Sequence, residues 1–326
     1  YDNERSSMRL SLFFTLLAVL YLRCVNDKPK ETLPRQADIA SSPTVPAFSG
    51  ERAFEYLVKQ TEFGPRNPNS AGHRACLTYL AATLREFADD VQLQPFAAQG
   101  YNEALALTNI IARFKPESPN RILLCAHWDT RPRADNDTNK QRRNQPILGA
   151  NDGASGVAVL LEIASLLKKQ PPPIGVDIVL FDGEDYGLEG DLSKYFLGSR
   201  FFAANKPADY NPRFAILLDM VGDTFLDLPK EYHSVQYAPD IVKMVWDKAR
   251  ALGYTQFLDE VGEAVNDDHL PLNEAGIKTI NIIDFNYPDP SHRYWHTHDD
   301  VPKNCSAESL EVVGTVLTHI IYSHHP

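Results

Sequence analysis

The chain has 326 residues, 43% of them hydrophobic and 23% charged, and its 17 Gly and 23 Pro are scattered, which is typical of a globular protein. This composition excludes collagen, a coiled coil or disorder for most of the chain. The 32 basic and 43 acidic residues give a net charge of −11, so no nucleic-acid partner is expected, because an excess of positive charge is needed to neutralise phosphates.

A short apolar run over residues 10–22 follows a basic start and is too short to span a bilayer. It predicts a signal-like segment over residues 1–24, no transmembrane span, and an exported protein that is periplasmic, secreted or anchored by its N-terminus. A frayed hydrophobic helix is the alternative. Cys24 lies where a bacterial lipoprotein carries its lipid, but Arg23 is bulkier than the small residue expected before it, so a lipid anchor at Cys24 stays open.

The polar, proline-rich residues 25–48 predict a tether, and residues 49–326 a single catalytic α/β domain, since the chain has neither an internal repeat nor a second block of distinct composition. Three further cysteines, Cys76, Cys125 and Cys305, have no CxxC spacing. They predict neither a disulfide framework nor a thiolate zinc site.

Within that domain the hydrophobic periodicity predicts elements that alternate between helix and strand. The strands are too apolar for a sheet with one solvated face, so we expect a three-layer α/β/α sandwich with a mixed central sheet. In chain order the predicted elements are helices over 53–61 and 72–87, strands over 91–96, 108–114 and 121–126, a polar surface loop over 131–148, a helix over 153–169, strands over 176–181 and 214–218, a helix over 240–252, a strand over 279–283 and a helix over 307–322.

Residues that can bind a metal or transfer a proton gather where the predicted strands end, which is where ligands bind in open α/β sheets. Histidine and carboxylates are the ligands of catalytic zinc. Each residue alone has an ordinary explanation, such as a helix N-cap for an aspartate, a core position for a histidine or a solvated turn for an acidic pair. Their joint placement favours a metal site. The residues concerned are His127, Asp152, Glu184, Asp185, Asp219 and His296.

Other catalytic motifs are absent from the sequence. It contains neither an HExxH zinc motif, nor a GxSxG nucleophile elbow, nor a glycine-rich phosphate loop. Metal-assisted chemistry is the class that remains.

Over roughly residues 50–322 the chain resembles the zinc-dependent glutaminyl cyclases of the animal and bacterial type, which are built on the fold of the M28 aminopeptidases. The resemblance implies an M28 zinc-peptidase-like fold. It rests on six motifs in the order of that family, namely HWDT (127–130), GANDGASG (149–156), FDGED (181–185), LLDMVGD (217–223), DDHLP (267–271) and WHTHDD (295–300).

By this resemblance one zinc ion is bound by Asp152, Asp185 and His296. Glu184 transfers the proton, and Asp219 with Asp267 forms a supporting hydrogen-bond pair. The resemblance also implies that Trp295 forms a wall of the pocket, with Trp128 and Asn266 as further substrate-binding candidates.

Two departures from the family pattern concern the loop after residue 181. The vertebrate cyclases have glutamate where this chain has Asp185, so the ligand is one methylene shorter. The indole-bearing residue that those enzymes place a few positions later is replaced around residues 187–191, which puts substrate contacts from that loop in doubt.

The implied substrates are peptides and proteins with N-terminal glutamine, which become pyroglutamate with release of ammonia. Such a glutamine holds both the amine and the γ-amide carbonyl, so ring closure is intramolecular and needs no protein nucleophile. Zinc would polarise the γ-carbonyl, and Glu184 would take a proton from the amine and return it to the departing ammonia.

Two alternatives remain at this stage. A di-zinc M28 aminopeptidase would use His127 and Asp219 for a second ion, and both residues are present. Against it, Trp128 and Trp295 adjoin the two histidines and residues 267–269 follow the cyclase pattern. The second alternative is a non-catalytic binding protein of the same fold, which the intact ligand set disfavours. One, two or no zinc ions would distinguish the three.

Overall fold

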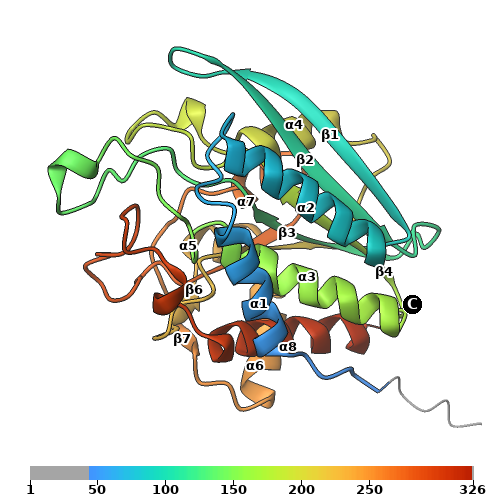
Figure 1. Cartoon of the computed structure of the whole chain (residues 1–326). Coiled ribbons are helices and arrows are strands. Elements are labelled where there is room, and N and C mark those ends of the chain that lie inside the picture. The colour runs from blue at the N-terminus through green and yellow to red at the C-terminus, as the bar shows by residue number, and fades with distance from the viewer. Residues whose placement is uncertain (1–43, 325–326) are drawn as a thin grey trace, which may run out of the picture. The chain divides into compact units, whose positions relative to one another are not determined.

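A six-stranded mixed sheet forms the centre of the fold, with strand order β1-β2-β4-β3-β5-β8. Figure 1 labels its first four strands, β1 to β4. β1, β2 and β4 are antiparallel neighbours, whereas β4, β3, β5 and β8 are parallel to one another. The carboxyl ends of four strands therefore meet at one edge. The strands are β1 (Asp90–Gln99), β2 (Ala104–Phe114), β3 (Arg121–His127), β4 (Gly175–Phe181), β5 (Ala215–Asp219) and β8 (Thr279–Ile283).

This computed structural model describes residues 44–324. The predicted signal-like segment, Cys24 and most of the predicted tether lie outside the described residues. Along residues 44–324, no helix combines the length and the apolar character needed to cross a membrane.

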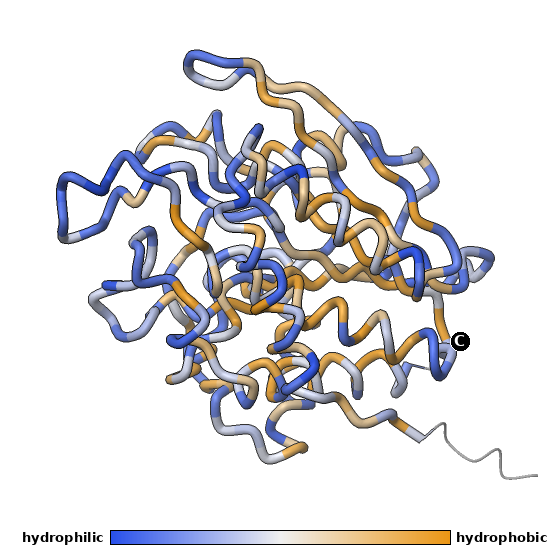
Figure 2. Tube along the Cα trace, in the orientation of Figure 1, coloured by the Kyte–Doolittle hydropathy of each residue, from blue (hydrophilic) through white to orange (hydrophobic). Residues whose placement is uncertain are grey.

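Alternate residues of the central strands enter two different cores, because successive side chains of a strand point to opposite faces. On one face Leu124, Ile178 and Ile216 belong to a large apolar core packed under five helices. These are α1 (Gly50–Thr61), α2 (Ala71–Phe87), α3 (Ala154–Lys169), α6 (Pro239–Ala251) and α8 (Ala307–Ser323). Figure 2 shows apolar residues along the sheet and these helices, and hydrophilic residues in the loops.

On the other face Leu123, Val179 and Leu217 pack with Phe202 and Leu272 in a second core. Those two residues come from the shorter helices α4 (Leu197–Asn205) and α7 (His269–Glu274). The sheet is thus covered on both sides, and the predicted three-layer α/β/α sandwich with a mixed sheet is confirmed.

The described chain also holds several short elements that the sequence analysis did not predict. Besides α4 and α7 they are α5 (Tyr232–Tyr237), the parallel pair β6 (Leu228–Lys230) and β7 (Phe257–Val261), and the 3-10 turns η1 (Lys140–Arg142), η2 (Leu192–Lys194) and η3 (Pro302–Asn304). Each is too short for its hydrophobic pattern to repeat often enough to be recognised in the sequence.

The segment over 131–148 is irregular apart from η1, and most of its residues are exposed or half-buried, as expected for a surface loop, but four residues are not. Arg131, Ala134, Asp137 and Ile147 in this segment are buried. Its basic, aperiodic composition suggested a solvated loop, but Arg131 is buried because its guanidinium is paired with carboxylates.

Candidate active site

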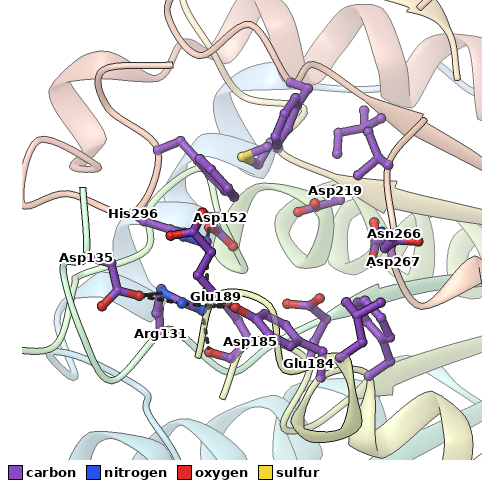
Figure 3. Close-up of a pocket in the computed structure, with 18 of the residues that line it drawn as sticks. Arg131, Asp135, Asp152, Glu184, Asp185, Glu189, Asp219, Asn266, Asp267 and His296 are labelled. Carbon is purple, nitrogen blue, oxygen red and sulfur yellow. Dashed lines mark hydrogen bonds and ion pairs between the residues drawn. The ribbon is translucent and has the colours of Figure 1, made fainter. Parts of the chain in front are cut away.

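A pocket of about 340 Å³ opens at the edge where the parallel strands end (Figure 3). Glu184 and Asp185 reach it from the turn after β4, and Asp219 from the last position of β5. Asp152 enters from the turn before α3, and His296 from the loop after β8. Residues far apart in sequence meet here because the strands that carry them are parallel neighbours.

Asp152, Asp185 and His296 are grouped as metal ligands would be, with one ligand atom from each lying within 4.8 Å of the others. His296 Nε2 lies 3.6 Å from Asp152 Oδ2 and 3.4 Å from Asp185 Oδ2. Asp185 Oδ2 is buried and has no hydrogen-bond partner among the described residues, so this oxygen is available to a hydrogen-bond donor or a metal ion. Two carboxylates and one imidazole are a donor set that suits zinc, and the residues therefore fit the metal.

A second group of ligand atoms adjoins the first. His127 Nε2 lies 3.3 Å from Asp152 Oδ1 and 3.2 Å from Asp219 Oδ1, and the three residues satisfy the same distance criterion. The two groups share Asp152. The residues could therefore hold one ion in the first group, or one ion in each group.

Backbone amides fix the turns that carry the acidic residues. Asp129 accepts hydrogen bonds from the amides of Glu184 and Asp185 at 3.0 and 3.3 Å. Asp300 accepts from the amide of Asp152 at 3.2 Å. Gly153 follows with φ of +104°, and a Cβ there would lie 2.5 Å from the Asp129 carbonyl oxygen, so only glycine fits this turn.

His296 itself has a left-handed backbone, with φ of +55°. A residue with a Cβ adopts this conformation at some cost in energy, and such residues are concentrated at functional sites. The strained turn directs the imidazole toward Asp152 and Asp185, and the amide of Asn136 donates to the His296 carbonyl at 3.2 Å.

Arg131 supports the candidate ligand Asp185 from behind. Its Nη1 donates to Asp185 Oδ1, and its other nitrogens bond to Asp135 and to the Tyr195 hydroxyl (Figure 3). Burial raises the pKa of Asp185, but Arg131 and then His296 outweigh that effect and hold the pKa well below its usual value. Asp185 is therefore anionic, as a metal ligand must be.

Glu184 and Asp267 have pKa values raised well above those of free carboxyls. Burial is the largest cause for both, and the neighbouring charges of Asp185 for Glu184 and Asp219 for Asp267 add to it. Burial lowers the pKa of His127, but the neighbouring carboxylates of Asp129, Asp152 and Asp219 raise it well above its usual value overall. Of these, Asp219 is hydrogen-bonded to His127 Nε2 at 3.2 Å.

Asp267 is held by its own hydrogen bonds. Its Oδ2 accepts from Asn281 Nδ2 at 2.6 Å, and its Oδ1 from the amide of Asp268 at 2.5 Å. Asp219 lines the same pocket, but among the described residues the two carboxylates are not hydrogen-bonded to each other. The structure thus brings Asp219 and Asp267 to one pocket as neighbouring charges.

The two tryptophans predicted to bind substrate lie in different parts of the structure. Trp295 lines the pocket, and its indole stacks on the His296 ring with the centroids 3.9 Å apart. Trp128 does not line the pocket, because it is buried in the large core, where it stacks on His73. The reason is strand alternation, since His127 points to the site and the next residue must point away. Asn266 lines the pocket as predicted.

The sequence analysis did not identify Arg131, Tyr195, Glu189 and Phe285, all of which line the pocket. Arg131 directly follows the HWDT motif, and an arginine beside so many acidic residues was the available signal. Around residues 187–191, where the family indole is missing, Glu189 and Gly190 form part of the wall.

Two solved structures match nearly the whole described chain. The glutaminyl cyclase of Bacteroides thetaiotaomicron bound to N-acetylhistamine is 44% identical, with a TM-score of 0.83, covering 86% of this chain and 100% of that one. A Zn-dependent exopeptidase of Parabacteroides distasonis is 39% identical, with a TM-score of 0.83 and the same coverage of 86% and 100%.

Two curated relatives point to the same two activities. Aminopeptidase YwaD of Bacillus subtilis is 28% identical over 84% of this chain, which spans only 57% of that protein. The glutaminyl-peptide cyclotransferase of Bos taurus is 22% identical over 77% of this chain and 76% of its own length. The model of peptidase family M28 matches residues 109–321. This match covers most of the chain, including every candidate ligand, and the chain belongs to peptidase family M28.

Proposed function

We propose that this protein is a zinc-dependent glutaminyl-peptide cyclotransferase, which converts the N-terminal glutamine of peptides and proteins to pyroglutamate with release of ammonia. The observation that carries the proposal is that Glu184 and Asp267, two carboxyls outside the candidate ligand group, line the same pocket as Asp152, Asp185 and His296. A cyclase must move one proton from an amine to a leaving amide nitrogen, and such groups suit that task. The match to a solved glutaminyl cyclase over its full length supports the same conclusion.

Asp152, Asp185 and His296 would hold a zinc ion, whose Lewis acidity would polarise the γ-carbonyl of the substrate glutamine. The remaining steps belong to the chain's own residues. The free α-amine attacks the γ-carbonyl carbon within the same residue, so the pocket has only to hold the glutamine folded. Trp295 forms an apolar wall beside His296 that would exclude water from the ring as it closes.

Glu184 takes a proton from the attacking amine as the carbon–nitrogen bond forms. It then returns that proton to the γ-nitrogen, which leaves as ammonia when its bond to carbon breaks. Asp267, held by Asn281, would accept a hydrogen bond from the substrate nitrogen and keep it oriented toward Glu184. No atom is left over, since the products are the pyroglutamyl peptide and ammonia.

The second candidate function is a di-zinc aminopeptidase. The observation in its favour is the group His127, Asp152 and Asp219, which could hold a second ion. In that case Glu184 would activate a water molecule instead of receiving a proton from an amine.

A side-by-side assay tests the proposal. Purified protein is incubated with a peptide that begins with glutamine and with a leucine anilide, while ammonia release, anilide cleavage and zinc content are measured. We expect ammonia release and one zinc per chain. A peptide with an acetylated N-terminal glutamine is the control, because it has no free amine to attack. Anilide cleavage with two zincs and no ammonia would instead establish the aminopeptidase.

We also propose that residues 1–24 direct export, that residues 25–48 form a tether, and that residues 49–326 are the single catalytic domain. Mass analysis of the mature N-terminus after expression tests this, since an uncleaved chain retained in the cytoplasm would contradict it.

A further inference from the structure

Arg131 is a buried charge in the wall of the active-site pocket, with its side chain only 1% exposed. Among the described residues that line the pocket, it is the one lysine or arginine. A buried guanidinium is tolerated only where acceptors satisfy its N–H donors and anions balance its charge. The partners of Arg131 are the carboxylates of Asp185 and Asp135 and the hydroxyl of Tyr195.

The two oxygens of Asp185 have different surroundings. Oδ1 accepts from Arg131 Nη1, whereas Oδ2 has no hydrogen-bond partner among the described residues and lies 3.4 Å from His296 Nε2. Arg131 Nη1 also lies 3.3 Å from the Asp185 carbonyl oxygen, so it contacts both the side chain and the backbone of that residue. The carboxylate is thereby prevented from rotating, and one defined oxygen faces the other ligands.

The far side of the guanidinium is also fixed. Asp135 Oδ2 accepts from Arg131 Nε at 2.8 Å, and the Tyr195 hydroxyl lies 3.0 Å from Nη2. The segment that supplies Asp135 continues to Asn136, whose amide donates to the His296 carbonyl. One loop in the pocket wall thus contacts two of the three candidate ligands, Asp185 and His296.

We infer that Arg131 is a positioning residue for the metal site, which fixes Asp185 so that a single oxygen faces His296 and thereby sets the affinity for zinc. The inference rests on the ligand set of the proposed function. Aspartate has a shorter side chain than glutamate, so its carboxylate must be oriented more accurately to reach the metal ion. Partners that orient metal ligands in this way typically contribute 10- to 100-fold in affinity.

The test compares Arg131→Gln with a matched control, Arg121→Gln. Arg121 is the first residue of β3, the strand whose other end leads into the loop with Arg131. It forms a two-pronged pair with Asp177, with both bonds at 2.8 Å, at the end of the strand opposite the pocket. Arg131→Gln loses the ion pairs with Asp185, a candidate ligand, and with Asp135, whereas Arg121→Gln loses the ion pair with Asp177, which is not a candidate ligand. Zinc affinity is measured by competition with a chromophoric chelator, and ligand geometry by the visible spectrum of the cobalt-loaded protein.

We expect Arg131→Gln to raise the zinc dissociation constant by about 10- to 100-fold and to change the cobalt spectrum. Arg131→Lys, which keeps the charge but not the planar fork, should give a smaller rise. Arg121→Gln should lower the melting temperature while leaving the dissociation constant within about threefold of the parent, because it does not reach a ligand. An Arg131→Gln protein that binds zinc as tightly as that control overturns the inference.

If Arg131→Gln does not fold, Asp135→Asn is used as the test variant in its place. It removes the carboxylate that holds the far side of the guanidinium, so zinc affinity should fall by about 10-fold, the lower end of the same range. An unchanged affinity in Asp135→Asn would overturn the inference equally. A parent protein that binds zinc but forms no pyroglutamate would refute the proposed function alone, since the readout here is metal binding.

Discussion

Replacing Glu184 by glutamine removes a carboxylate that lies beside the candidate ligands without belonging to them. Its side chain is 12% exposed, and its Oε2 lies 4.0 Å from His127 Nδ1, too far for a hydrogen bond. Glutamine keeps the size of the side chain and the amide anchor to Asp129, but it cannot accept the proton of the attacking amine. Turnover should therefore fall by roughly 10² to 10⁴, or about 3 to 5 kcal/mol of transition-state stabilisation.

The pH dependence of the parent enzyme follows from the same residue. Glu184 must be unprotonated to act as a base, so kcat/KM rises as the pH increases through its pKa. Burial, with the repulsion of Asp185 and Asp267, raises that pKa well above 4.5, so the acid limb of the profile should lie above this value. In Glu184→Gln that limb should disappear from the residual activity.

One preparation of each protein suffices for the assay. Ammonia release gives turnover, elemental analysis gives zinc content, and competition with an imidazole inhibitor gives the affinity of the pocket. Zinc content and inhibitor affinity should change little, because Glu184 acts mainly in the transition state. Glu260→Gln, an exposed glutamate on β7, is the control for the chemical change. Turnover of Glu184→Gln within about threefold of the parent would refute this account of the proton transfer.

Three further predictions concern other residues. Asp152→Ala and His296→Ala should each lose bound zinc and nearly all activity, and full zinc occupancy by elemental analysis would exclude that residue as a ligand. His127→Ala should retain about one zinc and lose activity by about 10- to 100-fold, whereas a fall from two zincs to one would favour the aminopeptidase. Glu231→Gln concerns stability. Burial raises the pKa of Glu231, but the His269 ring, 3.3 Å from its Oε2, and hydrogen bonds from Ser234 and from the amide of His233 lower it from 4.5 to about 2. The stabilisation is therefore present above pH 4.5 and is lost as the pH falls toward 2. Denaturant unfolding of the metal-free protein should show a loss of about 3 kcal/mol at pH 7 that shrinks at pH 3, and a loss independent of pH would contradict the pKa argument.

The sequence predicted the elements that form the core because those elements have strong periodicity. The strand predicted over 279–283 is β8, and the helix predicted over 153–169 is α3 apart from its first residue. β1 was predicted too short, over 91–96 instead of Asp90–Gln99, because it is an edge strand with little burial and its polar residues weaken the alternation. The short helices α4, α5 and α7 carry too few turns for a periodic pattern.

The sequence could predict those site residues that lie at the ends of the parallel strands. His127 and Asp219 are the last residues of β3 and β5, and Asp185 lies in the turn after β4. These three strands are parallel neighbours, so once the sequence identifies them it also brings these residues together. The support from Arg131 was not predictable in the same way. Its pairing with Asp185 spans 54 positions and depends on how an irregular loop folds back, for which hydrophobic periodicity carries no signal.

The concentration of acidic residues links the metal site to the proton transfer. Two like charges 4 Å apart repel by about 4 kcal/mol at an effective dielectric constant of 20, so a pocket holding Asp152, Asp185, Asp219, Glu184 and Asp267 cannot keep all five ionised without compensation. Arg131 compensates Asp185, and a zinc ion would compensate the ligand set. Glu184 and Asp267 lie outside that set, and their pKa values are raised by burial and by the repulsion of the remaining carboxylates. The same charges that make the pocket a metal site thus move these two carboxyls toward the range in which a proton can be taken up and returned near neutral pH.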